Sequence, residues 1–244
     1  MPVVAKGEQY VFAMNLEEVA EFVGLQGTGH TPLPPEVLIE KWMLVLRAAQ
    51  RLSRQLSPAQ LAENVIPNRE RSIRLLAHHV FRVGGAFLDT VLRNDEYTNA
   101  LATVPPPEGG CISGDQLAVY GDEVIRDIQK WWDSLSDRSC SRKVPTFIGP
   151  LSIHLLFERS TWHSAQHARQ LASVVERFGI KPDRPLTADD LAGLPMPAIP
   201  VAVACRKNST TELVTGTKPK LVTLKDDHAP MRPQVGEARM GTGR

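Results

Sequence analysis

Four long stretches of the chain repeat apolar side chains at intervals of three and four residues, the spacing that lines up one face of an α-helix. They cover about 34–56, 70–91, 114–135 and 150–178. Segments rich in Pro, Gly and polar residues separate them, and only residues 2–6 suggest a strand. Amphipathic helices bury their apolar faces most simply against one another, so we predict an all-α fold, an antiparallel four-helix bundle.

The ends of these helices are also marked in the sequence. Proline at position 34 or 35 suits the first turn of the first helix, and Gly179 followed by Pro182 is a typical end for the last. The segment NDEYTNALATVPPPEGGCISG, between the second and third helices, is predicted to be a loop. Its length suggests that it partly covers a site.

Three domains are expected from these patterns. Residues 1–30 contain a strand, a turn at Gly7, an amphipathic helix that Gly24 ends, and a linker. This unit is too small to bury its own apolar face, so it must dock on something larger or on a second subunit. Residues 31–196 form the helical domain, and residues 197–244, with scattered prolines and little periodicity, are predicted to be an extended or disordered tail.

The amino-acid composition argues against several classes of function. Twenty-eight Lys and Arg against 27 Asp and Glu leave a net charge of +1, which argues against nucleic-acid binding without a local patch. Cys111, Cys140 and Cys205 lie far apart and form no CxxC, so we expect neither a disulfide framework nor a thiolate zinc site, and a cytoplasmic location. The sequence shows no secretion signal and no apolar run long enough to span a membrane.

The strongest chemical signal is HSAQH in the last predicted helix. His163 and His167 are four residues apart, so their rings stack on one helical face and can bind one ion together. That face should point to the core, because it comprises Ile153, Leu156, Ser160, His163, His167, Gln170 and Val174. Burying two imidazoles without partners is costly, whereas a metal ion compensates for their desolvation. A pair at this spacing also arises by chance in a chain with seven histidines, so HSAQH alone is a weak motif.

A third ligand must come from another helix, and His78 and His79 are the candidates. His79 shares its face with Leu76 and Val83, close to the apolar stripe, whereas His78 groups with arginines that belong in water. We therefore predict a site of His79, His163 and His167 for one divalent transition metal: zinc, nickel, manganese or iron. Three protein ligands leave a coordination position open, as in catalytic sites.

Other residues near this site have weaker signals. Gln170 could support one of the metal-binding histidines or touch a molecule bound to the metal. Trp162 and Arg159 flank the histidine pair, where they could contact substrate. A core tryptophan and a solvated arginine are the plainer interpretations of the last two. His30 and His154 are expected at the surface, as are carboxylates such as Glu158, and no general acid or base is assigned.

Two segments resemble a known family. RSIRLLAHHVFRV and TWHSAQHARQL are similar to the histidine-bearing helices of the DinB/YfiT-like superfamily of metal-binding four-helix bundles, in the same order and separation. The resemblance covers about residues 34–194. It implies metal ligands at His79, His163 and His167, and an activity such as that of the family's thiol-dependent transferases and isomerases.

Residues 2–25 additionally resemble the end of a glutaredoxin domain, with a Pro-Val strand, a Gly turn and a closing helix, although the CxxC half is missing. This resemblance makes glutathione the first thiol to consider.

Three functions remain open. The first is a thiol-dependent transferase or isomerase, in which the metal presents a thiolate to a small electrophilic molecule. The second is a hydrolase that uses metal-activated water. The third is a non-catalytic metal-binding stress or dimerisation module, which predicts a closed coordination sphere and no pocket. A homodimer is expected in each case, because helical bundles often bury an apolar face against a second copy.

Overall fold

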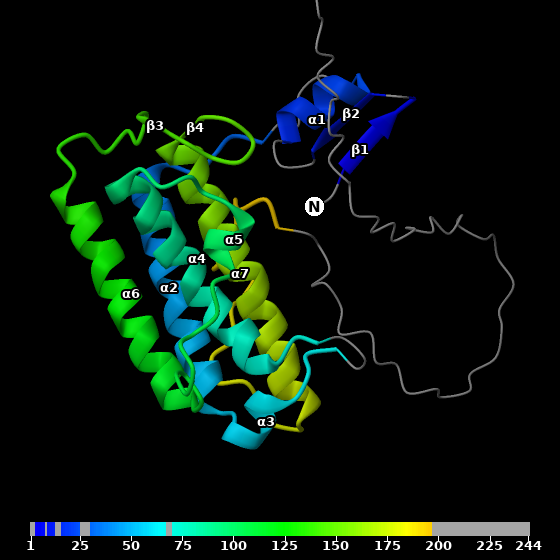
Figure 1. The fold of residues 1–244 in the computed structure, drawn as a ribbon, viewed down its shortest axis with the longest axis vertical. Coiled ribbons are helices and arrows are strands. Elements are labelled where there is room, and N and C mark those ends of the chain that lie inside the picture. The colour runs from blue at the N-terminus through cyan, green and yellow to red at the C-terminus, as the bar shows by residue number, and fades with distance from the viewer. Residues whose placement is uncertain (1–2, 8, 13–15, 25–29, 67–69, 197–244) are drawn as a thin grey trace, which may run out of the picture. The chain divides into compact units, whose positions relative to one another are not determined.

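The computed structural model describes residues 3–7, 9–12, 16–24, 30–66 and 70–196, and within them the protein is predominantly helical (Figure 1). The predicted helical class is confirmed. The two sheets among these residues are small antiparallel strand pairs. The predicted tail, residues 197–244, lies outside the described residues.

Four long helices occupy the four periodic stretches: α2 is Pro35–Arg54, α4 is Ile73–Arg93, α6 is Gly114–Ser134 and α7 is Ile153–Arg177. Proline occupies the first turn of α2. A serine precedes each of the other three, and its side chain accepts a hydrogen bond from a backbone N–H of the first turn. These caps make α4 and α7 begin a few residues later than expected.

Short elements lie in segments that are predicted to be breaks or loops. They are α3 (Pro58–Ala62), α5 (Asn99–Ala102), β3 (Lys143–Val144) and β4 (Leu151–Ser152). Each is too short to show periodicity. The two helices follow capping side chains, those of Ser57 and Thr98. Of these elements, α5 matters most for the functional site.

The N-terminal unit contains the expected strand and helix. β1 (Val3–Lys6) pairs antiparallel with β2 (Gln9–Phe12), a second strand that the sequence did not suggest, and α1 is Leu16–Val23. Gly7 in the turn and Gly24 after α1 both have positive φ, the region that glycine adopts without strain.

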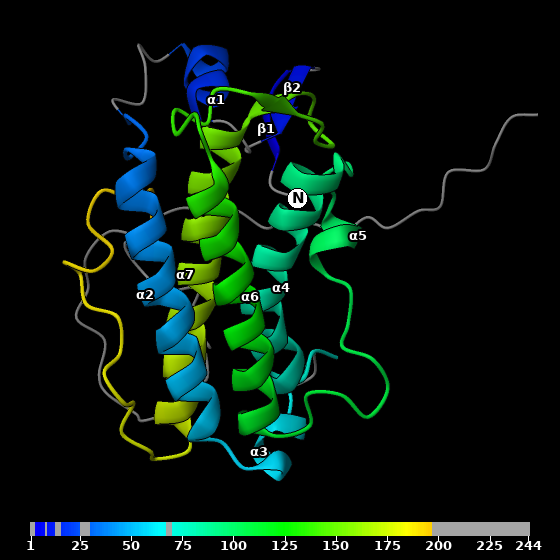
Figure 2. The same ribbon diagram turned by 90° about the vertical axis from the view of Figure 1, so that its left-hand side faces the viewer.

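The four long helices lie side by side, with α2 and α4 each packed against both α6 and α7 (Figures 1 and 2). α2 and α7 run in the same direction: His154 at the start of α7 bonds the Leu33 carbonyl before α2, and Gln55 after α2 bonds the Lys181 carbonyl beyond α7. α4 and α6 also run in the same direction, because the connection 94–113 returns along the helices (Figure 2). The other two contacts, α2 with α6 and α4 with α7, are antiparallel, so the predicted antiparallel arrangement is wrong for the pairs α2–α7 and α4–α6.

The core at one end is aromatic. Trp42, Phe87, Trp131 and Phe157 come from the four helices, and the Phe87 ring centroid lies 5.3 Å from that of Trp42, 4.8 Å from that of Trp131 and 5.5 Å from that of Phe157. Towards the other end, leucines and valines replace the rings. Among the described residues no helix combines the length and apolar character needed to cross a membrane.

Candidate metal centre

His79, His163 and His167 converge in the contact between α4 and α7. One nitrogen from each ring lies within 4.8 Å of the others, and no other group of three or more His, Cys, Asp or Glu among the described residues could hold a metal in this way. The Nε2 atom of His163 is 3.1 Å from Nε2 of His79 and 3.1 Å from Nε2 of His167. The predicted residues are therefore brought together.

The donor set fits a tetrahedral transition-metal ion. Metal–nitrogen bonds of about 2.0–2.1 Å, at tetrahedral angles, separate two nitrogen ligands by roughly 3.3–3.4 Å. The two separations from His163 are only slightly shorter, and all three ligand nitrogens lie within 4.8 Å of one another. Ring rotations that bring the nitrogens of His79 and His167 to the same separation would let one ion bind all three.

Hydrogen bonds on the far side of two rings orient them for this role. Nδ1 of His79 donates to the Ala102 carbonyl of α5 at 2.8 Å, and Nδ1 of His167 donates to Oε1 of Gln170 at 3.2 Å. A neutral imidazole that carries its proton on Nδ1 presents a lone pair at Nε2. Histidine ligands of metals commonly have such an outer partner, and Gln170 lies where it was predicted to act.

The three Nε2 atoms are poorly satisfied by one another. His79 and His167 both direct lone pairs at Nε2 of His163, which holds at most one proton in the plane of its ring. A single proton cannot serve both acceptors well. A shared cation would satisfy all three nitrogens at once, and the donor chemistry therefore fits a metal.

Burial keeps these rings uncharged. Desolvation is the largest cause of the lowered pKa of each ring, which falls to about 4 for His79, about 3 for His167 and about 2 for His163. Repulsion from neighbouring histidines adds to the lowering for His163 and His167, and the positive charge of Arg71 adds to it for all three. At neutral pH the ligands do not have to lose protons before they bind a cation.

One side of the cluster opens into a cavity of about 470 Å³. The three histidines line it together with Arg71, Leu75, His78, Thr103, Val104 and Pro105. The last three belong to the connection 94–113, which was expected to cover a site in part. The cluster is thus enclosed by helices on one side and accessible to a small molecule on the other, as a catalytic metal site requires.

The prediction that His78 faces water is wrong. His78 is only 6% exposed, and its ring stacks on Tyr120 of α6 with centroids 4.8 Å apart and planes 11° apart. Tyr120 and the 94–113 connection cover this face of α4, which a periodicity analysis of α4 alone cannot reveal. His79 still supplies the ring that reaches the α7 pair.

Trp162 and Arg159 lie beside the cluster rather than in the cavity. The Trp162 ring stacks against His163 with centroids 5.8 Å apart, and the Arg159 guanidinium carbon is 5.7 Å from the centre of the Trp162 ring. Neither residue lines the cavity. Their positions favour a supporting role for the His163 ring over contact with a substrate.

Three residues expected at the surface have structural contacts instead. Glu158 is 5% exposed, accepts a hydrogen bond from the Leu33 backbone N–H at 2.9 Å, and has an oxygen 2.9 Å from Nε2 of His30. His154 contacts the Leu33 carbonyl at 2.7 Å. The segment before α2 packs on this face of α7, so the solvated interpretation is wrong for Glu158, whereas His30 and His154 are half-buried.

Sequence reasoning missed Arg71 and Leu75 as lining residues. A usable signal was present for Leu75, which lies four residues before His79 on the same side of α4, whereas Arg71 precedes the capping residue Ser72 and lies outside the helical repeat. The same spacing that identified the ligands therefore extends to the cavity wall.

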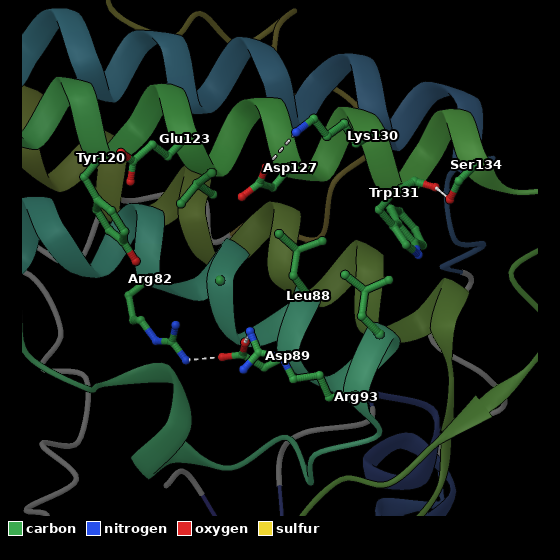
Figure 3. Close-up of a pocket in the computed structure, with 13 residues that line it drawn as sticks. Arg82, Leu88, Asp89, Arg93, Tyr120, Glu123, Asp127, Lys130, Trp131 and Ser134 are labelled. Atoms are coloured by element: carbon green, nitrogen blue, oxygen red, sulfur yellow. Dashed lines mark hydrogen bonds and ion pairs between the residues drawn. The ribbon is translucent and has the colours of Figure 1, made fainter.

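A second cavity, of about 440 Å³, lies between α4 and α6 (Figure 3). Its charged side chains largely pair with one another: Asp89 bonds Arg82 and lies 3.2 Å from Arg93, and Lys130 lies 3.7 Å from Asp127. We call it the α4–α6 cavity, and we call the cavity beside the histidines the histidine cavity.

No protein-family model matches this chain, and the searches of curated proteins and of solved structures also gave no significant match. The resemblance to the DinB/YfiT-like superfamily therefore stays a prediction.

Proposed function

We propose that the protein is a metal-dependent enzyme that holds one divalent transition-metal ion, such as zinc, on His79, His163 and His167, and carries out a thiol-dependent transfer or isomerisation of a small electrophile. The observation that carries the proposal is the convergence of three Nε2 atoms beside an open cavity, with two rings oriented by Ala102 and Gln170.

The family assignment belongs to the same proposal. The packing of α2, α4, α6 and α7 is compatible with a DinB/YfiT-like four-helix bundle, in which one histidine comes from the second long helix and two from the last. A homodimer is also proposed. Leu44 on α2 and Val119 on α6 are 40% and 57% exposed, and a second copy could cover such residues.

The chain's own residues would have distinct tasks. Ala102 and Gln170 keep the Nε2 lone pairs of His79 and His167 directed at the ion. Leu75, Val104 and Pro105 would offer apolar surface to a substrate in the cavity. A divalent ion bound there would supply Lewis acidity, which lowers the pKa of a coordinated thiol or water. Glutathione is the proposed thiol, on the basis of the glutaredoxin-like N-terminal sequence.

The cavity also helps to choose between the two alternative functions, the hydrolase and the non-catalytic module. A non-catalytic metal-binding module predicts a closed site, whereas the three histidines border about 470 Å³ of open space. A hydrolase that uses metal-activated water fits the same geometry, so it is the second candidate. The choice between thiol and water depends on the substrate and needs a kinetic test.

The test combines metal analysis with activity. Protein purified from metal-supplemented medium should contain about one transition-metal ion per chain by elemental analysis. We expect it to accelerate the reaction of glutathione with 1-chloro-2,4-dinitrobenzene, and chelation should abolish the acceleration. Hydrolysis of p-nitrophenyl acetate without thiol would instead favour the hydrolase. Protein without metal after supplementation would contradict both enzymatic proposals.

A further inference from the structure

Arg71 is the one cationic side chain among the described residues that line the histidine cavity. It directly precedes Ser72, the residue that caps α4, and its own carbonyl accepts a hydrogen bond from the Val65 backbone N–H. The backbone of Arg71 is thereby fixed at the edge of the cavity. Its side chain is half-buried rather than extended into solvent.

The Arg71 guanidinium has no hydrogen bond or ion pair to any described residue, although neighbouring arginines do. Arg74 donates to the Gly110 carbonyl at 2.9 Å, and Arg82 bonds Asp89. Desolvation lowers the pKa of Arg71, and none of the described carboxylates opposes it. A partly desolvated guanidinium that no described residue pairs with is unfavourable, and an anion in the cavity would compensate for it.

The charge around the cavity has one sign. No Asp or Glu is among the described residues that line it, and the histidines are neutral. With a divalent ion on the three rings, the site would hold two positive centres and no protein anion. Such a cavity attracts negatively charged ligands and disfavours cationic ones.

We infer that Arg71 binds a carboxylate of the small molecule that occupies the histidine cavity, an inference that rests on the proposed metal function. The planar guanidinium fits a carboxylate through two parallel N–H···O bonds. Leu75, Val104 and Pro105 offer apolar contacts for the carbon chain of the ligand. The ligand class is therefore a small carboxylic acid with a second polar group, such as a thiol, that reaches the histidines.

Cobalt-loaded protein provides a test with an optical readout. Coordination of a thiolate to Co²⁺ produces a charge-transfer band in the near ultraviolet, which reports binding without any turnover. The probes are 3-mercaptopropionate and its neutral amide, 3-mercaptopropionamide, which have nearly the same shape. We expect the acid to bind the wild-type protein about tenfold to a hundredfold more tightly than Arg71→Gln protein, as expected for a charge-assisted contact. The amide should bind both proteins equally.

Arg74→Gln is the matched control, because Arg74 lies only three residues further along, in the first turn of α4, but does not line the cavity. It should bind both probes as the wild type does, and Arg71→Lys should be intermediate, since it keeps the charge but loses the two-bond geometry. Equal binding of the acid by wild-type and Arg71→Gln proteins that both hold cobalt would overturn the inference and leave the metal site standing. Absence of cobalt from the wild-type protein would overturn the metal site itself, and the inference with it.

Discussion

The histidine cavity and the α4–α6 cavity have almost the same volume, about 470 and 440 Å³, and both are bordered by α4. They differ in whether the polar side chains that line them have hydrogen-bond or ion-pair partners. In the α4–α6 cavity Asp89 and Asp127 are paired with basic side chains (Figure 3). In the histidine cavity three ring nitrogens face one another and Arg71 has no partner among the described residues. Unsatisfied polarity, not volume, distinguishes a candidate binding site from a surface groove.

The largest effect is expected when one of the three candidate ligand histidines of the histidine cavity is removed. His163→Ala and His167→Ala should each abolish metal retention, because two remaining imidazoles bind an ion far more weakly than three. Elemental analysis after gel filtration should find about one ion in the wild type and close to none in either variant.

His78→Ala is the matched control, since His78 lines the same cavity but belongs to no metal cluster. It should retain the metal. Loss of metal from His78→Ala with retention by the His163 variant would reverse the ligand assignment.

Lowering the pH should decrease the free energy of unfolding of the metal-free protein, because the histidines that line the histidine cavity take up protons more readily in the unfolded chain. The fold lowers the pKa of His78, His79, His163 and His167, so the unfolded chain binds more protons below pH 6.5. The resulting stability is complete above pH 6.5 and is lost as the pH falls towards the folded-state values. Each histidine should lower the free energy of unfolding by on the order of 1–2 kcal/mol between pH 7 and pH 5.

Urea unfolding of the metal-free protein at several pH values measures this loss. His163→Leu removes one of the titrating groups, so its slope between pH 5 and pH 6 should be smaller by roughly 1 kcal/mol per pH unit. An identical slope in the two proteins would mean that His163 does not titrate differently in the folded and unfolded states.

Gln170→Leu tests the outer hydrogen bond of the site. The substitution keeps a side chain of similar size but removes the oxygen that accepts from Nδ1 of His167. Zinc affinity, measured by competition with a chelator, should fall by about 10- to 100-fold. Gln166→Leu, the same change one helical turn earlier, should leave the affinity unchanged, and equal losses in both variants would indicate a general effect on α7.

The smallest effect is expected in the α4–α6 cavity. Asp127 is about half-exposed, with Lys130 3.7 Å and Arg126 3.8 Å from its carboxylate. Asp127→Asn should change the free energy of unfolding by no more than about 0.5 kcal/mol and leave zinc affinity unaltered. A clear loss of zinc affinity would show that the two cavities are less independent than their walls suggest.

The three candidate ligands could be predicted from the sequence because helical register is local. Spacing alone puts His163, His167 and Gln170 on one side of α7, and the apolar neighbours of His79 indicate an inward position on α4. The structure brings the three histidines together with the register that was predicted.

Residues whose environment depends on distant parts of the chain could not be predicted in this way. His78 is covered by Tyr120 of α6, and Glu158 is buried by the segment that contains His30 and Leu33. The parallel direction of α2 and α7 likewise depends on the path of the connections, which periodicity does not encode. Each case needs knowledge of tertiary neighbours.

Two consecutive backbone carbonyls of the four-residue helix α5 accept hydrogen bonds from two different side chains of α4. Leu101 accepts a hydrogen bond from Nε of Arg82 at 3.0 Å, and Ala102 accepts the one from Nδ1 of His79. The connection 94–113 supplies none of the three candidate ligands, yet it sets the rotation of the His79 ring. An affinity tag, protease site or foreign loop inserted between Tyr97 and Thr103 would therefore disturb the orientation of His79 in an engineered protein, and with it the proposed metal binding, even with all three histidines intact.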